Sequence, residues 1–310
     1  MNDLKIGIIG VGGVGGFLAG LLCRTYPHVT LGARSQRKED LISQGVILHS
    51  DLYGEVISEP ERICEVKQMQ AQDILFICVK NYSLDTVCQE LSSLISNRTI
   101  IVPVMNGVDS GDRIRQTVPR GIVIDAVIYI VSFLNKNGSI SQEGDFARLF
   151  IGTKNKKHLE ASLLIHRVLS NAGIDSHFSE DIEAEIWRKY ILNCAYNVLT
   201  ARYEEPIGAL RKSPIKSKQY EDLLWEAYAV AKAKGVRVTA KDVENMIHKF
   251  YHEYANNATS SLMRDIMNHK PAELETFGGY IVKEGERLHV PVTVSKQMYE
   301  AIMMKVSSQT

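Results

Sequence analysis

Three polar side chains recur at helical spacing inside an otherwise apolar segment. The segment runs from Ile186 to Thr200, and Lys189, Asn193 and Asn197 stand in it at every fourth position. Residues four apart share one face of an α-helix. A helix that is apolar around most of its circumference is buried, and a buried amide without a partner costs about 1–3 kcal/mol. A bound polar substrate would supply such a partner.

Two other interpretations fit the same spacing. Lys189 could pair with Glu185, one turn earlier, on a solvated face. The two asparagines could instead bind neighbouring backbone groups. Against the first, a solvated face more often carries glutamate and lysine than asparagine, which is a poor helix former. The pattern therefore favours a site for a polar ligand.

A glycine-rich turn near the start of the chain provides a second chemical signal. The apolar run at residues 6–9 predicts a strand, residues 17–22 predict a helix, and between them stand Gly10, Val11, Gly12, Gly13, Val14 and Gly15. A G-x-G-x-x-G turn in this context is typical of dinucleotide binding. The first glycine turns the chain, the second admits a pyrophosphate, and the third lets the helix pack closely. The helix N-terminus attracts the phosphates. The alternative is a tight strand–helix turn without a ligand.

The residues after the second predicted strand indicate which nucleotide is bound. An acidic residue about 20 positions beyond the glycines usually holds the ribose 2′-hydroxyl of NAD. Here residues 32–37 carry no carboxylate but two guanidinium groups. Arg34 could hold a 2′-phosphate through paired hydrogen bonds, with a further donor from Ser35. The alternative is a basic loop facing solvent. We favour NADP(H) as the cofactor.

Two further candidates follow predicted parallel strands. Residues 73–79 and 99–104 are apolar runs of the kind that form central strands, and Lys80 and Asn106 come soon after them. Ligands of open α/β sheets bind beyond the carboxyl ends of the strands. The alternatives are a surface lysine and an ordinary turn asparagine before Gly107.

The distribution of strand-like and helix-like runs predicts two domains. Strand-like runs end at Phe178, helical periodicity holds from Asp181 onward, and the boundary is expected near Glu180. We therefore predict an α/β protein. Residues 1–180 should form an NADP-binding domain with a Rossmann-type, doubly wound and mainly parallel sheet, including a hairpin or meander that turns at Asn137-Gly138. Residues 181–310 should form an all-helical substrate and catalytic domain, with the active site in the cleft between the two.

Composition excludes several classes of partner. Lys+Arg and Asp+Glu number 36 each, so no net positive field favours nucleic acid or an acidic membrane surface. No apolar run reaches the length of a membrane span, and no signal peptide is expected. The five cysteines lack C-x-x-C spacing, which indicates reduced thiols in a cytoplasmic protein. No metal site is expected, because Lys249 stands where the H-E-x-x-H pattern of His248 and His252 would need glutamate.

Taken in order, these motifs resemble the ketopantoate reductase (2-dehydropantoate 2-reductase) family. The similarity covers nearly the whole chain. It includes the glycine turn, Arg34, Val79-Lys80, Asn106-Gly107, the run from Trp187 to Ala201, Ser260-Ser261 with Met263 and Asp265, and Glu273 before Gly278-Gly279. The Lys/Asn helix with its Leu-Thr-Ala tail is the most specific of these motifs, and the glycine turn is the least specific.

The resemblance implies an activity and a role for each matching residue. It implies that Lys189 protonates the carbonyl oxygen during reduction of ketopantoate to pantoate by NADPH, a step in pantothenate and coenzyme A biosynthesis. It also implies substrate contacts from Asn193, Asn197, Ser261 and Asn106, and contacts with the cofactor or the edge of its site from Arg34, Lys80, Asn106 and Glu273. The expected partners are a small 2-oxo acid and, as one option, a second copy in a homodimer.

Two departures from the family pattern concern the substrate. Ile207 stands near the place where the family often has a further substrate-binding asparagine, and Met105 stands where it usually has glutamine. The alternatives are therefore a reductase of another small 2-oxo acid on the same scaffold, or an NADP(H)-binding redox sensor without catalysis. A sensor would need only the site of the first domain.

Overall fold

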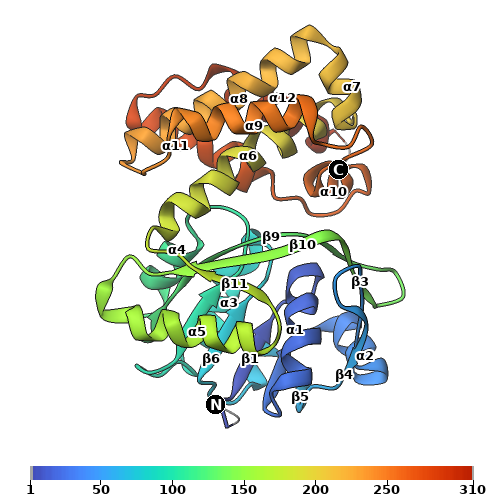
Figure 1. Cartoon of the computed structure of the whole chain (residues 1–310), viewed down its shortest axis with the longest axis vertical. Coiled ribbons are helices and arrows are strands. Elements are labelled where there is room, and N and C mark those ends of the chain that lie inside the picture. The colour runs from blue at the N-terminus through green and yellow to red at the C-terminus, as the bar shows by residue number, and fades with distance from the viewer. Residues whose placement is uncertain (1–2, 309–310) are drawn as a thin grey trace. The chain divides into compact units, whose positions relative to one another are not determined.

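The computed structural model describes residues 3–308, which form two compact units that divide between Glu185 and Ile186 (Figure 1). The first unit contains a six-stranded, wholly parallel sheet in the order β5-β2-β1-β6-β7-β8. Its strands are β1 (Ile6–Ile9), β2 (Val29–Gly32), β5 (Arg62–Cys64), β6 (Ile74–Ile77), β7 (Ile100–Pro103) and β8 (Ile122–Val123).

Continuous apolar runs form the centre of this sheet. Every residue of β1, β2, β6 and β7 is buried, which is the pattern of parallel strands covered on both faces. The connecting helices are α1 (Gly13–Thr25), α2 (Ser35–Gln44), α3 (Leu84–Leu91) and α4 (Ser110–Thr117). Short 3₁₀ or π segments are labelled η, and η1 (Val66–Gln68) and η2 (Asn81–Ser83) belong to this part.

A second sheet of five strands also lies in the first unit. It runs β11-β10-β3-β4, with β9 paired to β10, and it mixes parallel and antiparallel pairs. Its strands are β3 (Val46–Ser50), β4 (Gly54–Ser58), β9 (Asp125–Leu134), β10 (Ile140–Gly152) and β11 (Asp175–Phe178), and η3 (Lys156–His158) and α5 (Leu159–Asn171) follow β10. Helix α1 contacts strands of both sheets. The apolar core around Phe17 and Leu22 is therefore shared between them.

The hairpin predicted from the sequence is present. Strands β9 and β10 pair antiparallel, and Gly138, in the turn between them, has a φ of +83° that favours glycine. The apolar run that begins at Gly121 is not one strand, because the chain leaves β8 of the parallel sheet and enters β9 of the second sheet near Ile124.

The second unit is helical. No strand follows Phe178 within the described chain, which confirms the predicted fold class. Its helices are α6 (Ile182–Tyr203), whose first turn belongs to the first unit, α7 (Ile207–Lys212), α8 (Pro214–Ala233), α9 (Ala240–His252), α10 (Ser261–Met267), the π-helix η4 (Glu275–Gly279), α11 (Tyr280–Leu288) and α12 (Thr293–Ser307).

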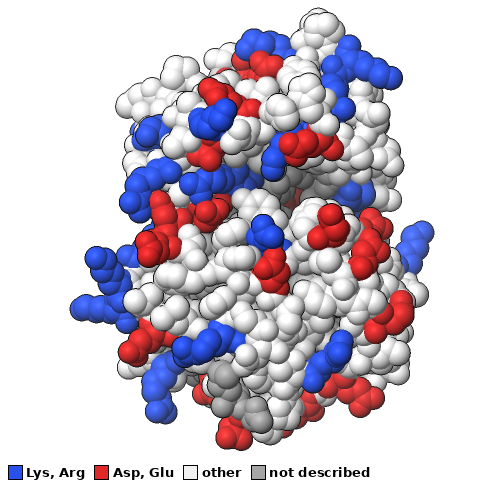
Figure 2. All heavy atoms as spheres, viewed as in Figure 1, with Lys and Arg blue, Asp and Glu red and all other residues white. Residues whose placement is uncertain are grey.

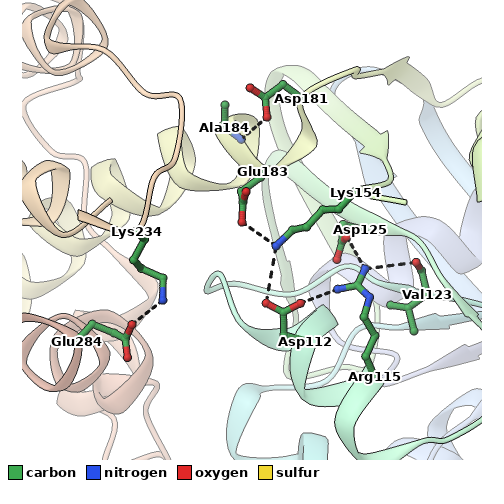
Figure 3. Close-up of polar contacts among 10 residues, drawn as sticks. All are labelled: Asp112, Arg115, Val123, Asp125, Lys154, Asp181, Glu183, Ala184, Lys234 and Glu284. Atoms are coloured by element: carbon green, nitrogen blue, oxygen red, sulfur yellow. Dashed lines mark hydrogen bonds and ion pairs between the residues drawn. The ribbon is translucent and has the colours of Figure 1, made fainter. Parts of the chain in front are cut away.

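The start of α6 is fixed by charged groups of the first unit. Oδ1 of Asp181 accepts a hydrogen bond from the Ala184 N–H at 3.3 Å. Glu183, in the first turn, pairs with Lys154 at 2.7 Å, and Lys154 also lies 3.7 Å from Asp112 (Figure 3). These contacts define where the helix that carries Lys189 begins.

The surface carries both signs of charge. On the face shown in Figure 2, Lys and Arg residues are interspersed with Asp and Glu residues, in keeping with their equal numbers in the sequence. Within residues 3–308, no helix combines the length and the apolar character that a membrane span requires.

Candidate active site

The glycine turn has the geometry that a dinucleotide requires. Gly10 has a φ of +86°, and a Cβ atom added there would lie 2.7 Å from Cγ1 of Val79. A Cβ atom at Gly15 would collide with the carbonyl oxygen of Gly10, so this glycine allows the close approach of α1 to the end of β1. A Cβ atom at Gly12 would meet no heavy atom of the described chain within 4 Å. The backbone at Gly12 is therefore open to a ligand.

The first turn of α1 fits a phosphate electrostatically as well. Gly12 precedes the helix, no side chain caps its N-terminus, and the turn from Gly13 to Gly16 has no acidic residue. The unpaired N–H groups and the partial positive charge of the helix end attract an anion. The residues present thus fit the pyrophosphate of a nicotinamide dinucleotide.

The other predicted cofactor residues lie along the same edge of the parallel sheet. Arg34 follows β2, Lys80 follows β6 and Asn106 follows β7. With the glycine turn after β1, these segments belong to four neighbouring strands. The side chain of Asn81 joins two of the loops, because its Nδ2 donates to the Asn106 carbonyl oxygen at 2.7 Å. The predicted positions at strand ends are confirmed, and the roles of these residues stay predictions.

Arg34 is well placed to meet a ligand. Its side chain is exposed, and it directly precedes α2. The next residue, Ser35, has a φ of +51°, a left-handed conformation that is uncommon for residues other than glycine. Strained backbone of this kind clusters at ligand-binding positions.

In the second unit, Lys189 lies on α6 beside a buried carboxylate. The lysine is partly buried, and burial lowers its pKa to about 8, while the negative charge of Glu273 acts in the opposite direction. Glu273 is itself buried, with 4% of its surface exposed. The resemblance to the family implies a contact of Glu273 with the cofactor or the edge of its site. Its electrostatic link to Lys189 was not anticipated.

Asn197 and Ser261, two of the predicted substrate residues, are in contact. Asn197 is buried, and its Oδ1 accepts hydrogen bonds from Ser261 Oγ and from the Leu262 N–H, each at 3.3 Å. The amide oxygen of Asn197 therefore binds a backbone group, as one of the two alternative interpretations of the sequence expects. Asn193, one turn earlier on α6, is partly buried.

The neighbouring serine, Ser260, has a structural role at the start of α10. Ser260 is the N-cap of α10, because its Oγ accepts from the Met263 N–H at 3.1 Å. It also accepts from Thr200 Oγ1 at 2.7 Å. These bonds fix the start of α10 against α6, which leaves Ser261 as the first residue of the helix.

Sequence reasoning missed Tyr190, the residue after the predicted catalytic lysine. Its hydroxyl donates to the carbonyl oxygen of Thr276 at 2.6 Å. Thr276 belongs to the π-helix η4, which starts two residues after Glu273, and π-helical turns are frequent at functional sites. No local sequence signal identifies this bond, because tyrosine in an apolar helix is usually a core residue.

The two departures from the family pattern lie in buried surroundings. Ile207 is fully buried at the start of α7, and Met105 is 9% exposed next to Asn106. The side chain of Ile207 therefore offers no accessible surface to a ligand.

A parallel sheet with a glycine turn and polar residues along one edge is the arrangement typical of dinucleotide-binding proteins. Two models of one family extend this conclusion. The model described as ketopantoate reductase PanE/ApbA matches residues 6–156, and the model of its C-terminal part matches residues 181–306. The chain belongs to the ketopantoate reductase family, whose members are pyridine-nucleotide-dependent oxidoreductases, and it is an oxidoreductase of that family.

Individual relatives resemble the chain over nearly its whole length. An uncharacterized oxidoreductase, YkpB of Bacillus subtilis, is 26% identical over 97% of this chain and 98% of its own. A 2-dehydropantoate 2-reductase of Archaeoglobus fulgidus is 24% identical over the same shares of the two chains. A solved ketopantoate reductase of the PanE/ApbA family from Ralstonia eutropha superposes with a TM-score of 0.89 at 25% identity, covering 99% of both chains.

A solved D-mandelate dehydrogenase with NADH and anilino(oxo)acetate is a similar structure too. Its TM-score is 0.88 at 21% identity, over 98% of this chain and 99% of that one. At this identity the likeness concerns the fold.

Proposed function

We propose that the protein is a 2-dehydropantoate 2-reductase, which reduces ketopantoate to pantoate with NADPH and serves pantothenate and coenzyme A biosynthesis. The observation that carries this proposal is the partly buried Lys189 with a pKa near 8, on the helix that also presents Asn193 and Asn197. Relatives named 2-dehydropantoate 2-reductase support it. We assign nucleotide binding to residues 1–180 and substrate binding with proton transfer to residues 181–310.

The central task of the protein is to manage charge on the ketone oxygen. Bound NADPH supplies the hydride that reduces the ketone carbon. As the carbonyl is reduced, negative charge builds on its oxygen, and the ammonium group of Lys189 stabilises that charge and then donates a proton to it. A pKa near 8, below the usual value of about 10.4, makes the lysine a stronger acid near neutral pH.

The remaining polar residues of the second unit bind and orient the 2-oxo acid. Asn193 and Asn197 donate to its hydroxyl and carbonyl oxygens, and Ser261 helps to hold its carboxylate. The bond between Asn197 and Ser261 supports a common role, because it fixes both side chains in one place before the substrate arrives. Such preorganisation reduces the entropy that binding costs.

Cofactor choice follows from Arg34. No carboxylate stands in residues 32–37 to hold a ribose 2′-hydroxyl and repel a phosphate, and the exposed guanidinium of Arg34 can pair with the 2′-phosphate of NADPH. Lys80 and Asn106 contact the dinucleotide from the ends of β6 and β7. Glu273 steadies the ribose next to the reacting carbon.

The direct test follows the loss of NADPH absorbance with purified protein and ketopantoate, and then with a panel of aliphatic and aromatic 2-oxo acids. Ketopantoate should give the highest kcat/KM. No turnover of any 2-oxo acid would contradict the proposal and leave the redox sensor as the explanation for a nucleotide site.

A second candidate is the reduction of another small 2-oxo acid. It is favoured because Ile207 cannot make the polar substrate contact of an asparagine. This buried side chain stands near a position at which the family often binds substrate through asparagine. The similarity to a D-mandelate dehydrogenase makes aromatic 2-oxo acids a useful part of the panel. A preference for one of them over ketopantoate would establish this candidate.

A further inference from the structure

Arg37 joins the glycine turn to two other segments of the first unit. It lies in the first turn of α2, and its Nε donates to the carbonyl oxygen of Val11 at 2.8 Å. Its Nη1 donates to the carbonyl oxygen of Gly138 at 2.6 Å. One guanidinium thus connects α2, the glycine turn and the turn of the β9–β10 hairpin.

The charge of this guanidinium is not neutralised by a bonded carboxylate. Arg37 makes no ion pair with any residue in the range 3–308, and its Nη2 is buried without a hydrogen-bond partner there. Burial lowers the pKa of Arg37, and the charge of Asp40 opposes this shift, but Oδ1 of Asp40 accepts from Gln36 instead, at 2.8 Å. Charges withdrawn from water are normally paired, so a partly buried guanidinium without a bonded carboxylate beside the glycine turn indicates that an anion is expected nearby.

The hairpin also holds the glycine turn from another direction. Oγ of Ser132, on β9, donates to the carbonyl oxygen of Gly13 at 2.9 Å, and a Cβ atom added at Gly13 would collide with the carbonyl oxygen of Ser132. The hairpin is thereby linked to both Val11 and Gly13, the residues on either side of Gly12. These contacts fix the backbone at the point where it is open to a ligand.

We propose that Arg37 is a positioning residue for the pyrophosphate of the cofactor. It holds the glycine turn so that its N–H groups face the phosphates, and it places a positive charge beside them. The inference rests on the proposed function in taking the ligand to be a nicotinamide dinucleotide. Arg37 differs from Arg34 in that it serves the part of the molecule shared by NADPH and NADH, whereas Arg34 serves the 2′-phosphate.

The test compares the affinities of both nucleotides in Arg37→Met, which keeps an unbranched apolar stem but removes the donors and the charge. Dissociation constants are measured by fluorescence titration of the folded protein. Both should rise about tenfold, because the charge-assisted hydrogen bonds that tie Val11 of the glycine turn to the hairpin turn at Gly138 are lost, and the ratio between the two constants should stay that of the wild type. The KM for NADPH should rise by a larger factor than the kcat falls. Arg37→Lys, which keeps the charge but reaches only one carbonyl oxygen, should restore part of the affinity.

Gln44→Met is the matched control. Nε2 of Gln44 donates from α2 to the carbonyl oxygen of Asn137 at 3.1 Å, so this variant loses a bond to the same hairpin turn without touching the glycine turn. It should bind both nucleotides as the wild type does, and thermal unfolding of both variants reports any general loss of stability.

Several results would overturn the inference. Wild-type affinities in Arg37→Met would refute it and leave the proposed function intact. A loss confined to NADPH would make Arg37 a ligand of the 2′-phosphate, and an equal loss in Gln44→Met would reduce Arg37 to a structural role. A wild-type protein that binds neither nucleotide would refute the proposed function together with this inference.

Discussion

Ser261 Oγ donates a hydrogen bond to Asn197 Oδ1 at 3.3 Å and so joins the first turn of α10 to the middle of α6. The same oxygen also accepts from the Leu262 N–H. With two donors at its oxygen, Asn197 can offer its amide nitrogen to a substrate oxygen. One side chain thus has a structural contact and a proposed ligand contact at the same time.

Asn197→Ala should therefore reduce both stability and substrate affinity. The variant leaves the Leu262 N–H and Ser261 Oγ without their acceptor, which costs about 1–3 kcal/mol in the free energy of unfolding. The KM for the 2-oxo acid should rise as well. Asn193→Ala is the control, because this partly buried asparagine should raise KM with little effect in urea unfolding. Equal effects of the two substitutions on stability would argue against the dual role.

Lys189→Ala should lower kcat by about 10²–10⁴-fold, the usual contribution of a general acid. NADPH affinity should be nearly unchanged, because the residues predicted to hold the nucleotide belong mainly to the first unit. Steady-state kinetics on the best 2-oxo acid, together with a nucleotide titration, separate the two quantities. A variant that keeps the wild-type kcat would rule out Lys189 as the proton donor.

Reductase activity should fall as pH rises through about 8, where Lys189 loses its proton. The negative charge of Glu273 raises the pKa of Lys189, so Glu273→Gln should lower that pKa and shift the alkaline limb of the kcat profile to lower pH. Glu275→Gln is the control, since this carboxylate binds the hydroxyl of Tyr299 instead. A limb that stays in place or moves to higher pH in Glu273→Gln would contradict the assignment.

Arg34→Ala should discriminate between the two nucleotides. A charge-assisted hydrogen bond contributes roughly 1.5–3 kcal/mol, so the dissociation constant of NADPH should rise about tenfold or more. That of NADH, which lacks the 2′-phosphate, should barely change. Fluorescence titrations with both nucleotides provide the measurement. Equal losses, or a wild-type protein that prefers NADH, would exclude this role for Arg34.

Arg115→Met should destabilise the first unit strongly. Arg115 pairs at 2.5 Å with Asp125, which is 4% exposed, so the variant leaves a buried carboxylate unpaired at a cost of about 3–5 kcal/mol (Figure 3). Burial raises the pKa of Asp125. The decrease in the free energy of unfolding that Arg115→Met causes should therefore become smaller as pH falls and this carboxyl is protonated. Urea titrations of both variants provide the measurement. Arg148→Met, which breaks the exposed pair with Asp175, should lower the free energy of unfolding by less than about 1 kcal/mol. Similar losses of stability in the two variants would refute the larger contribution of the buried pair.

Features that depend on neighbours in the chain could be predicted from the sequence. The glycine turn is encoded locally, because a φ of +86° at Gly10 and the close approach at Gly15 each require glycine. Apolar runs specify the parallel strands, and a four-residue spacing places Lys189, Asn193 and Asn197 on one face of α6. The change from strand-like to helix-like periodicity after Phe178 predicted the helical second part.

Contacts between distant segments were decided only by the tertiary structure. The sequence gives no indication that Glu273 acts on Lys189, that Ser261 binds Asn197, or that Arg37 bridges Val11 and Gly138. Nor does the sequence show that β9 and β10 belong to a second sheet and not to the parallel one. Local propensity and periodicity determine which face of an element is apolar. The partner across that face depends on how the elements pack, and packing brings together residues whose spacing in the sequence carries no signal.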